Sequence, residues 1–328
     1  MRWARTLLIA FLAGAVSAPA LPMAQTGQVE PAGQDEEDAA SVVRTGPLAQ
    51  QRVTIPVQIG DRGPWHFVID TGSQRTVVSR ALVDRLTLRP NQTVTVLSMA
   101  GRAQVDSVEL PPIAFGAGAI KDIQAPVLDE EHLGAPGLLG LDGLQSKRLL
   151  MDFRAGRMTI SPSRRRISSD PEAIVVEARR RNGQLILLNS QVEGMSVNII
   201  LDTGTDFSVG NMALFQKLTK RGRAPNLIPA TLTSVTGDPL TGLVGRIRTM
   251  RMGGVTLRDL PVLFADASPF KELKLDDKPA LLLGISALRI FDRVAIDFGR
   301  GRVDFLLPDQ GARSDVQLVA SPGAPAPS

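Results

Sequence analysis

The 328-residue sequence has no cysteine, no tyrosine and only two histidines, His66 and His132. Without cysteine the chain can form neither a disulfide framework nor a catalytic thiolate, and it cannot hold cysteine-ligated zinc or iron–sulfur groups. Two histidines do not favour a histidine-rich metal centre, and a Ser-His-Asp enzyme would have to use one of them. We therefore predict no metal site and no cofactor.

Long apolar runs and a strong charge of one sign are also missing. The apolar run from Leu7 to Val16 is too short to cross a bilayer, which takes about 20 residues, and no later run is longer. The 37 basic and 33 acidic residues give a formal net charge of +4, and the densest arginine runs, 164–166 and 179–181, form no single stripe. We expect no nucleic-acid partner, and no integral membrane span once the N-terminal segment is removed.

The two ends of the sequence differ in composition from the middle. Arginines, the apolar run and then small residues make 1–24 typical of a secretory signal peptide, so we expect a bacterial protein that is exported to the periplasm or secreted. Residues 25–48 have too few large apolar side chains to repay the cost of ordering a backbone. We expect a disordered leader there and a disordered tail at 309–328, which ends in repeated proline and alanine.

The middle of the sequence repeats itself. The segment Ile-Asp-Thr-Gly-Ser at 69–73 recurs 132 residues later as Leu-Asp-Thr-Gly-Thr at 201–205. Further matched pairs follow in the same order in both copies: Ser79 with Asn211, Leu82 with Leu214, Leu86 with Leu218, 126–128 with 261–263, and 138–140 with 282–284. The duplication predicts two homologous units at 49–161 and 172–308, joined by a linker at 162–171.

Each unit begins with the pattern of a β-hairpin. Apolar and polar residues alternate from Val53 to Ile59, a turn follows at 61–63, and Phe-Val-Ile leads directly into Asp70. Ser79 and Asn211 are favourable N-cap residues, and apolar residues spaced four apart follow each of them, which predicts the same short helix twice. The predicted fold class is mainly β with a few short helices.

A carboxylate directly after an apolar strand is costly unless it has partners, yet the sequence places one there in both units. The glycines after Asp70 and Asp202 allow a tight turn whose backbone N–H groups can point at the carboxylate. The neighbouring hydroxyls provide further donors. They belong to Thr71, Ser73, Thr203 and Thr205.

The duplicated Asp-Thr-Gly motif, with a Leu-Leu-Gly segment after each copy, resembles the pepsin and retropepsin superfamily of aspartic proteases. In that superfamily two such loops meet at a twofold or pseudo-twofold axis. The resemblance implies a duplicated acid protease fold of two pseudo-symmetric β lobes and an aspartic endopeptidase that acts on a polypeptide substrate. It implies Asp70 and Asp202 as the catalytic pair, which shares one proton and activates a water molecule.

The resemblance also implies roles for the neighbours of the two aspartates. Gly72 and Gly204 would hold the loops, and Thr71 and Thr203 would brace them against each other. The hydroxyls of Ser73 and Thr205 would donate to the outer carboxylate oxygens. Donors of this kind favour the ionised form, so we predict activity on the acid side of neutral pH.

Pepsins carry a tyrosine on a single flap, whereas this sequence has no tyrosine and a candidate flap hairpin in each unit. The expected tips are Met99-Ala100-Gly101 and Val235-Thr236-Gly237. Two similar flaps resemble a symmetric retropepsin dimer held in one chain, so we expect a monomer that contains an intramolecular pseudo-dimer. We interpret Asp206, which extends the second motif, as a structural acid.

Two other functions remain open at this point. A catalytically silent, peptide-binding envelope protein could keep the same fold without turnover. A β-rich envelope protein could also use the two Asp-Thr-Gly loops merely as turns, although the apolar approach to both acids disfavours this.

Overall fold

The computed structural model describes residues 8–9, 54–116, 118–163, 172–222, 227–308 and 318–320. The predicted leader, almost all of the predicted signal peptide, most of the predicted linker and most of the predicted tail lie outside these residues. Two short strands flank the main body: β1 (Leu8–Ile9) pairs in parallel with β5, and β25 (Leu318–Ala320) pairs with β21. The signal peptide, the leader, the tail and the domain boundaries remain predictions.

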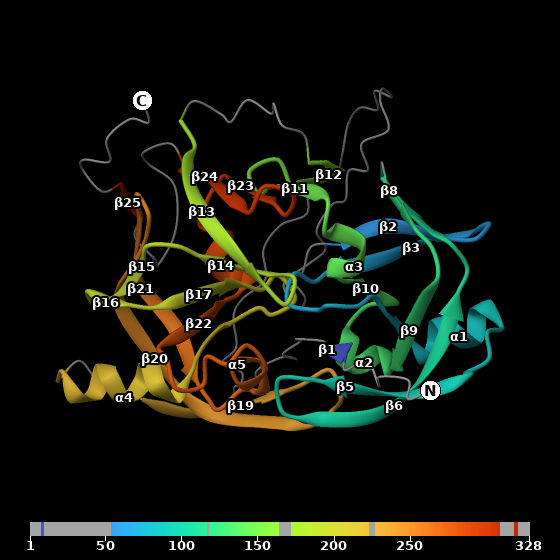
Figure 1. Cartoon of the computed structure of the whole chain (residues 1–328), viewed down its shortest axis with the longest axis horizontal. Helices are drawn as coiled ribbons and strands as arrows, with labels where there is room; N and C mark the ends of the chain where they lie inside the picture. Colours follow the sequence, from blue (N-terminus) through green and yellow to red (C-terminus); the bar gives the residue numbers. More distant parts are fainter. Residues whose placement is uncertain are drawn as a thin grey trace, which may run out of the picture.

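The first unit forms most of a ten-stranded sheet, in the order β1-β5-β6-β9-β4-β10-β3-β2-β7-β8 (Figure 1). Its elements are β2 (Thr54–Ile59), β3 (Arg62–Ile69), β4 (Val77–Ser79), α1 (Arg80–Leu86), β5 (Gln92–Leu97), β6 (Arg102–Leu110), β7 (Ile113–Phe115), β8 (Gly118–Ile120), β9 (Ile123–Leu128), α2 (Glu130–Leu133), β10 (Gly137–Leu139) and α3 (Leu141–Leu144).

A second, 15-stranded sheet contains every strand of the second unit (Figure 1). That unit's elements are β13 (Ile174–Arg181), β14 (Gln184–Leu187), β15 (Ser190–Val192), β16 (Met195–Ser196), β17 (Asn198–Leu201), β18 (Ser208–Gly210), α4 (Met212–Lys220), β19 (Ile228–Thr233), β20 (Pro239–Met252), β21 (Val255–Phe264), α5 (Ser268–Glu272), β22 (Ala280–Leu283), α6 (Ile285–Leu288), β23 (Arg293–Asp297) and β24 (Arg302–Leu306).

The sequence duplication corresponds to a duplicated topology. In the first unit β10 runs parallel to β3 and antiparallel to β4, which in turn runs parallel to β9. In the second unit β22 runs parallel to β17 and antiparallel to β18, which runs parallel to β21. The predicted fold class, mainly β with two pseudo-symmetric units and a few short helices, is therefore confirmed.

The two matched helices begin where the N-cap residues indicate. The Ser79 side chain accepts a hydrogen bond from Leu82 N (3.0 Å) at the start of α1, and the Asn211 side chain accepts one from Leu214 N (2.9 Å) at the start of α4. Such caps satisfy a backbone donor that the first helical turn leaves free. Leu82 and Leu214 are both buried, so each helix directs its apolar face into its own unit.

Two strands from the end of the first unit join the second sheet. They are β11 (Lys147–Asp152) and β12 (Arg157–Pro162), and β11 pairs antiparallel with β23. An ion cluster connects β11 with β24, because Asp304 of β24 accepts from Arg148 of β11 (3.2 Å) and from Arg302 of β24 (3.0 Å). The units thus share one sheet in space, although the linker separates them in sequence.

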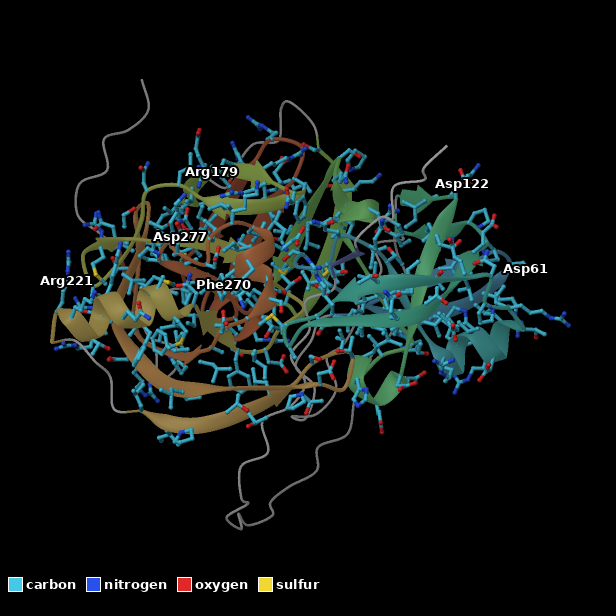
Figure 2. The ribbon with its side chains drawn as sticks, turned by 60° about the horizontal axis from the view of Figure 1, so that its bottom comes forward. Asp61, Asp122, Arg179, Arg221, Phe270 and Asp277 are labelled. Carbon is cyan, nitrogen blue, oxygen red and sulfur yellow. The ribbon has the colours of Figure 1, made fainter. Side chains whose placement is uncertain are left out.

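The two units lie at opposite ends of the molecule. In Figure 2, Asp61 and Asp122 mark one end, in the first unit, and Arg221, after α4, marks the opposite end in the second. No helix among the described residues is long and apolar enough to cross a membrane.

Candidate active site

Each Asp-Thr-Gly loop leaves the end of a buried strand at the same point of the duplicated topology. Asp70 follows β3, and its N–H donates to Leu139 O (3.0 Å) of β10. Asp202 follows β17, and its N–H donates to Leu283 O (3.1 Å) of β22. The Leu-Leu-Gly strands therefore hold both loops at their first residue.

The two loops face each other so closely that each one's glycine lies against the other's carboxylate. A Cβ atom built on Gly72 would lie 2.6 Å from Cγ of Asp202, and one built on Gly204 would lie 2.4 Å from Cγ of Asp70. Real Cβ atoms do not come so close to other heavy atoms. The structure thus brings Asp70 and Asp202 together, and it leaves room between them for glycine only.

The two threonines brace the loops across the junction. Thr71 N donates to Thr203 Oγ1 (3.1 Å) and Thr203 N donates to Thr71 Oγ1 (3.0 Å). The hydroxyls in turn donate to the opposite strand ends, Thr71 to Leu201 O (2.9 Å) and Thr203 to Ile69 O (2.7 Å). Because all four bonds are buried and join residues of different units, they fix the relative position of the two carboxylates.

Backbone N–H groups of each loop turn back to the aspartate that precedes them. Asp70 Oδ1 accepts from Gly72 N (2.8 Å) and Ser73 N (2.9 Å), and Asp202 Oδ1 accepts from Gly204 N (3.0 Å). These bonds favour the ionised carboxylate. Gly72, Gly204 and the backbone of Ser73 therefore contact the acids directly.

The hydroxyl of Thr205 has a different partner from the one we expected. It donates to the carbonyl oxygen of Phe207 (3.1 Å) rather than to a carboxylate oxygen, and the Ser73 hydroxyl makes the matching bond to Arg75 O (2.7 Å). A hydroxyl two residues before a free carbonyl readily closes such a local turn. Thr205 supports Asp202 through its backbone N–H instead.

Both carboxyl groups are completely buried. Burial, and after it the negative charge of Asp70, raises the pKa of Asp202 well above the usual value for an aspartate. Hydrogen bonds from the backbone of Gly204 and Thr205 oppose this rise. The aspartates therefore titrate as a coupled pair in which one proton is retained at pH values where an exposed aspartate has lost it.

Each unit has a hairpin at the predicted flap position. The first flap is the β5–β6 hairpin with its tip at Ser98–Gly101, and the second is the β19–β20 hairpin with its tip at Ser234–Asp238. These hairpins place Met99, Ala100, Gly101, Val235, Thr236 and Gly237 at the tips, as the sequence suggested. The tips contact each other, because Thr236 Oγ1 donates to Ser98 Oγ (3.1 Å).

Each flap tip packs against the opposite unit. Met99 is fully buried in an apolar cluster of second-unit residues that includes Phe270, which Figure 2 labels on α5, and Met99 O accepts from Ser268 N (3.0 Å). Val235 is fully buried in an apolar cluster of the first unit, and Gly237 lies against the ring of His132. The flaps are thus exchanged between the units, because each tip packs on the unit that does not contain it.

Comparison with known families gives two matches, one after the other. Residues 55–146 match the gag-polyprotein putative aspartyl protease family, and residues 188–287 match the aspartyl protease family. Each match contains one of the facing Asp-Thr-Gly loops. The chain belongs to the retropepsin-like aspartyl proteases. No curated protein matches it.

Two further side chains of this retropepsin-like chain support the first loop, and we did not single them out from the sequence. Asp142 of α3 accepts from Thr76 N (2.9 Å) and Thr76 Oγ1 (2.7 Å), and burial raises its pKa. Gln184, at the start of β14, donates to Gly72 O (2.8 Å). In the sequence, Asp142 and Gln184 are each a polar residue at the edge of an apolar segment. That pattern is too common to indicate that either residue contacts the first loop.

The second loop has its own supporting contacts. The Ser286 hydroxyl of α6 donates to the backbone carbonyl of Asp206. The charge of Asp206 also acts on Arg289, where it opposes the lowering of the arginine pKa by burial. The interpretation of Asp206 as a structural acid stays a prediction. Among the described residues, no group of three or more His, Asp or Glu side chains is arranged to hold a metal ion.

Proposed function

We propose that this retropepsin-like protein is an aspartic endopeptidase that hydrolyses peptide bonds with a water molecule activated between Asp70 and Asp202. The observation that carries the proposal is the juxtaposition of two completely buried carboxyl groups. Gly72 lies against the carboxyl of Asp202, and Gly204 lies against that of Asp70. Such a pair holds one proton between two acids, so a base and an acid are available at the same place.

The chemistry follows from that single proton. The ionised carboxylate accepts a proton from the water as its oxygen attacks the carbonyl carbon of the substrate, and the protonated carboxyl donates its proton to the carbonyl oxygen. A tetrahedral diol results. Proton transfer to the nitrogen and loss of a diol proton to the aspartate pair then break the C–N bond, which releases an acid and an amine and restores the pair to one proton.

The surroundings of the pair suit this reaction. The threonine brace keeps the two carboxyls from separating, and the backbone donors to Asp70 Oδ1 and Asp202 Oδ1 stabilise the charged member. The two flaps would exclude water from a bound peptide once it lies beneath their tips.

Digestion of a peptide library at several pH values, with and without pepstatin, tests the proposal. We expect endoproteolytic cleavage that is faster below neutral pH. Asp70→Asn and Asp202→Asn should each lower kcat by at least about a hundredfold, because each removes a group that transfers a proton. Cleavage that survives in both variants would contradict the proposal, and binding of peptides without turnover in the native protein would favour the silent peptide-binding alternative.

We also propose that the enzyme acts as a monomer in the bacterial periplasm or outside the cell. The signal-like pattern at 1–24 and the absence of cysteine support export, and the pairing of both loops within one chain supports a monomer. Fractionation of cells that express the full chain, together with light scattering of the purified protein, tests these two statements.

A further inference from the structure

A side chain of the second unit reaches the loop of the first aspartate. Gln184 is fully buried at the first position of β14, and its Nε2 donates to the carbonyl oxygen of Gly72 (2.8 Å). Because that atom is a carbonyl oxygen, only the amide nitrogen of the glutamine can face it. The contact therefore fixes the orientation of the glutamine amide as well as the position of the peptide.

The strand register explains why Gln184 lies there. Ile186 pairs with Ile200 in the antiparallel β14–β17 ladder, so the strand that carries Gln184 runs beside the strand that leads into Asp202. The Gln184 side chain itself bonds to the loop of Asp70.

The turn between β13 and β14 contacts the loop of Asp70 at a second point. Asn182 and Gly183, which join β13 to β14, have positive φ values of 48° and 84°, and Asn182 O accepts from Gln74 Nε2 (3.1 Å). The β13–β14 turn thus contacts the first loop on both sides of Ser73. Within the described ranges, no side chain donates to the equivalent carbonyl of Gly204, and Arg52, which occupies the position equivalent to Gln184, lies outside those ranges.

One peptide group links the glutamine to the acid. The carbonyl of Gly72 and the N–H of Ser73 belong to the same peptide unit, and Ser73 N donates to Asp70 Oδ1 (2.9 Å). A donor on the carbonyl side of a peptide polarises it and strengthens the bond that its N–H makes. The path therefore runs from the Gln184 amide through one peptide to the Asp70 carboxylate.

We propose that Gln184 is a positioning residue of the second unit that holds the Gly72–Ser73 peptide against Asp70 and thereby favours Asp70 as the charged member of the aspartate pair. The inference rests on the proposed function and adds an asymmetry to it. Two nearly equivalent aspartates would then enter the reaction in different states, Asp70 as the base and Asp202 as the holder of the proton.

Few charged groups face this path. Asp202 faces Asp70, and Arg75 in the same loop acts on Asp142. Arg181 is the register partner of Gln184 on β13. Below neutral pH, the carboxyl pair is therefore the group whose titration Gln184 can change.

The test compares Gln184→Met, which keeps the length of the side chain and removes the donor, with Gln184→Glu, which keeps a donor only while its carboxyl is protonated. Gln58→Met on an exposed position of β2 is the matched control. The first readout is the pH dependence of kcat/KM. The second is a carbon-13 NMR titration of labelled aspartate carboxyls, which requires no turnover.

We expect Gln184→Met to move the acid limb of the profile, and the lower apparent pKa of the pair in the NMR titration, upward by about half a pH unit. That shift is about a threefold loss of kcat/KM on the acid side. Gln184→Glu should follow the native profile while its carboxyl is protonated and lose activity at a lower pH than the native protein. Gln58→Met should match the native profile throughout.

A loss of kcat/KM by the same factor at every pH, with an unmoved NMR titration, would show a merely structural role and overturn the inference. If Gln184→Met does not fold, coincident profiles of Gln184→Glu and the native protein would overturn it. If the native protein cleaves nothing, the proposed endopeptidase fails, and the NMR titration still decides whether Gln184 biases the pair.

Discussion

Gly72 lies so close to Asp202 that a methyl group on its Cα would come within 2.6 Å of the opposite carboxyl carbon. We therefore expect Gly72→Ala to push the two loops apart and to lower kcat/KM by at least about a hundredfold, because a displacement of about 1 Å is that costly in a catalytic site. Gly204→Ala, with its Cβ 2.4 Å from Asp70 Cγ, should have the same effect. Steady-state kinetics on a cleaved peptide measures both.

The control for these variants is Gly254→Ala. Its Cβ would meet only a side-chain methyl of Ile174, at 3.2 Å, and that methyl can move aside. Activity should stay within about twofold of the native value. An active Gly72→Ala enzyme would mean that the loops separate during catalysis, contrary to the proposed mechanism.

The threonine brace predicts a stability effect that is independent of turnover. Thr203→Val keeps the shape of the side chain but removes the hydroxyl that donates to Ile69 O and accepts from Thr71 N. Two buried backbone groups then lose their partners, so we expect the free energy of unfolding to fall by about 2 to 4 kcal/mol. Urea denaturation followed by circular dichroism measures the loss.

Thr159→Val, on an exposed position of β12, is the matched control and should change stability by less than about 0.5 kcal/mol. Thr71→Val should resemble Thr203→Val, and the double variant should lose less than the sum because both hydroxyls hold the same junction between the loops. Equal stability of Thr203→Val and Thr159→Val would show that the brace contributes nothing.

Much of the fold could be predicted because the same local patterns occur in both homologous units of the sequence. The alternation before Asp70, the N-caps at Ser79 and Asn211 and the two Leu-Leu-Gly segments are local patterns with local causes. Their repetition removes the ambiguity that each has alone. The facing of the two aspartates then followed from the resemblance to a family with a twofold axis.

Other features depend on contacts that no local pattern encodes. An apolar residue at a turn, such as Met99, gives the same signal whether it packs on its own unit or on the opposite one. The pairing of β11 with β23 depends on the register between strands that are far apart in sequence. The sequence does not distinguish the two acceptors near the hydroxyl of Thr205, the carboxylate three residues before it and the backbone carbonyl two residues after it, and the structure selects the carbonyl.

The coupled aspartates make stability depend on pH with a definite sign. Burial and the charge of Asp70 raise the pKa of Asp202, so above the unfolded pKa of about 4 the folded state binds more protons than the unfolded state. Stability must then fall as pH rises from about 4 through the folded pKa of Asp202. Each unit of elevation costs about 1.4 kcal/mol at pH values above the folded pKa.

Asp202→Asn removes this penalty, so we expect the variant to melt at a higher temperature than the native protein at pH 7 and at nearly the same temperature at pH 3. Differential scanning calorimetry at the two pH values gives the comparison. Asp61→Asn, at an exposed turn, should show no such difference between pH 3 and pH 7. A native protein that is more stable than Asp202→Asn at pH 7 would contradict the assigned direction.

The exchanged flaps make the mobility of the first tip depend on one side chain. Met99 is fully buried among second-unit residues, and its carbonyl accepts from Ser268 N (3.0 Å), so the tip is fixed at both its side chain and its backbone. Met99→Ala removes the buried side chain, and we expect the backbone amides of 98–101 to exchange with deuterium at least about tenfold faster. Mass spectrometry of peptides from the first flap measures this.

Met195→Ala, the control, shortens a buried methionine on β16, outside the flaps, and should leave flap exchange unchanged while lowering global stability. If both variants accelerate exchange equally, the acceleration reports general destabilisation, and Met99 does not anchor the flap.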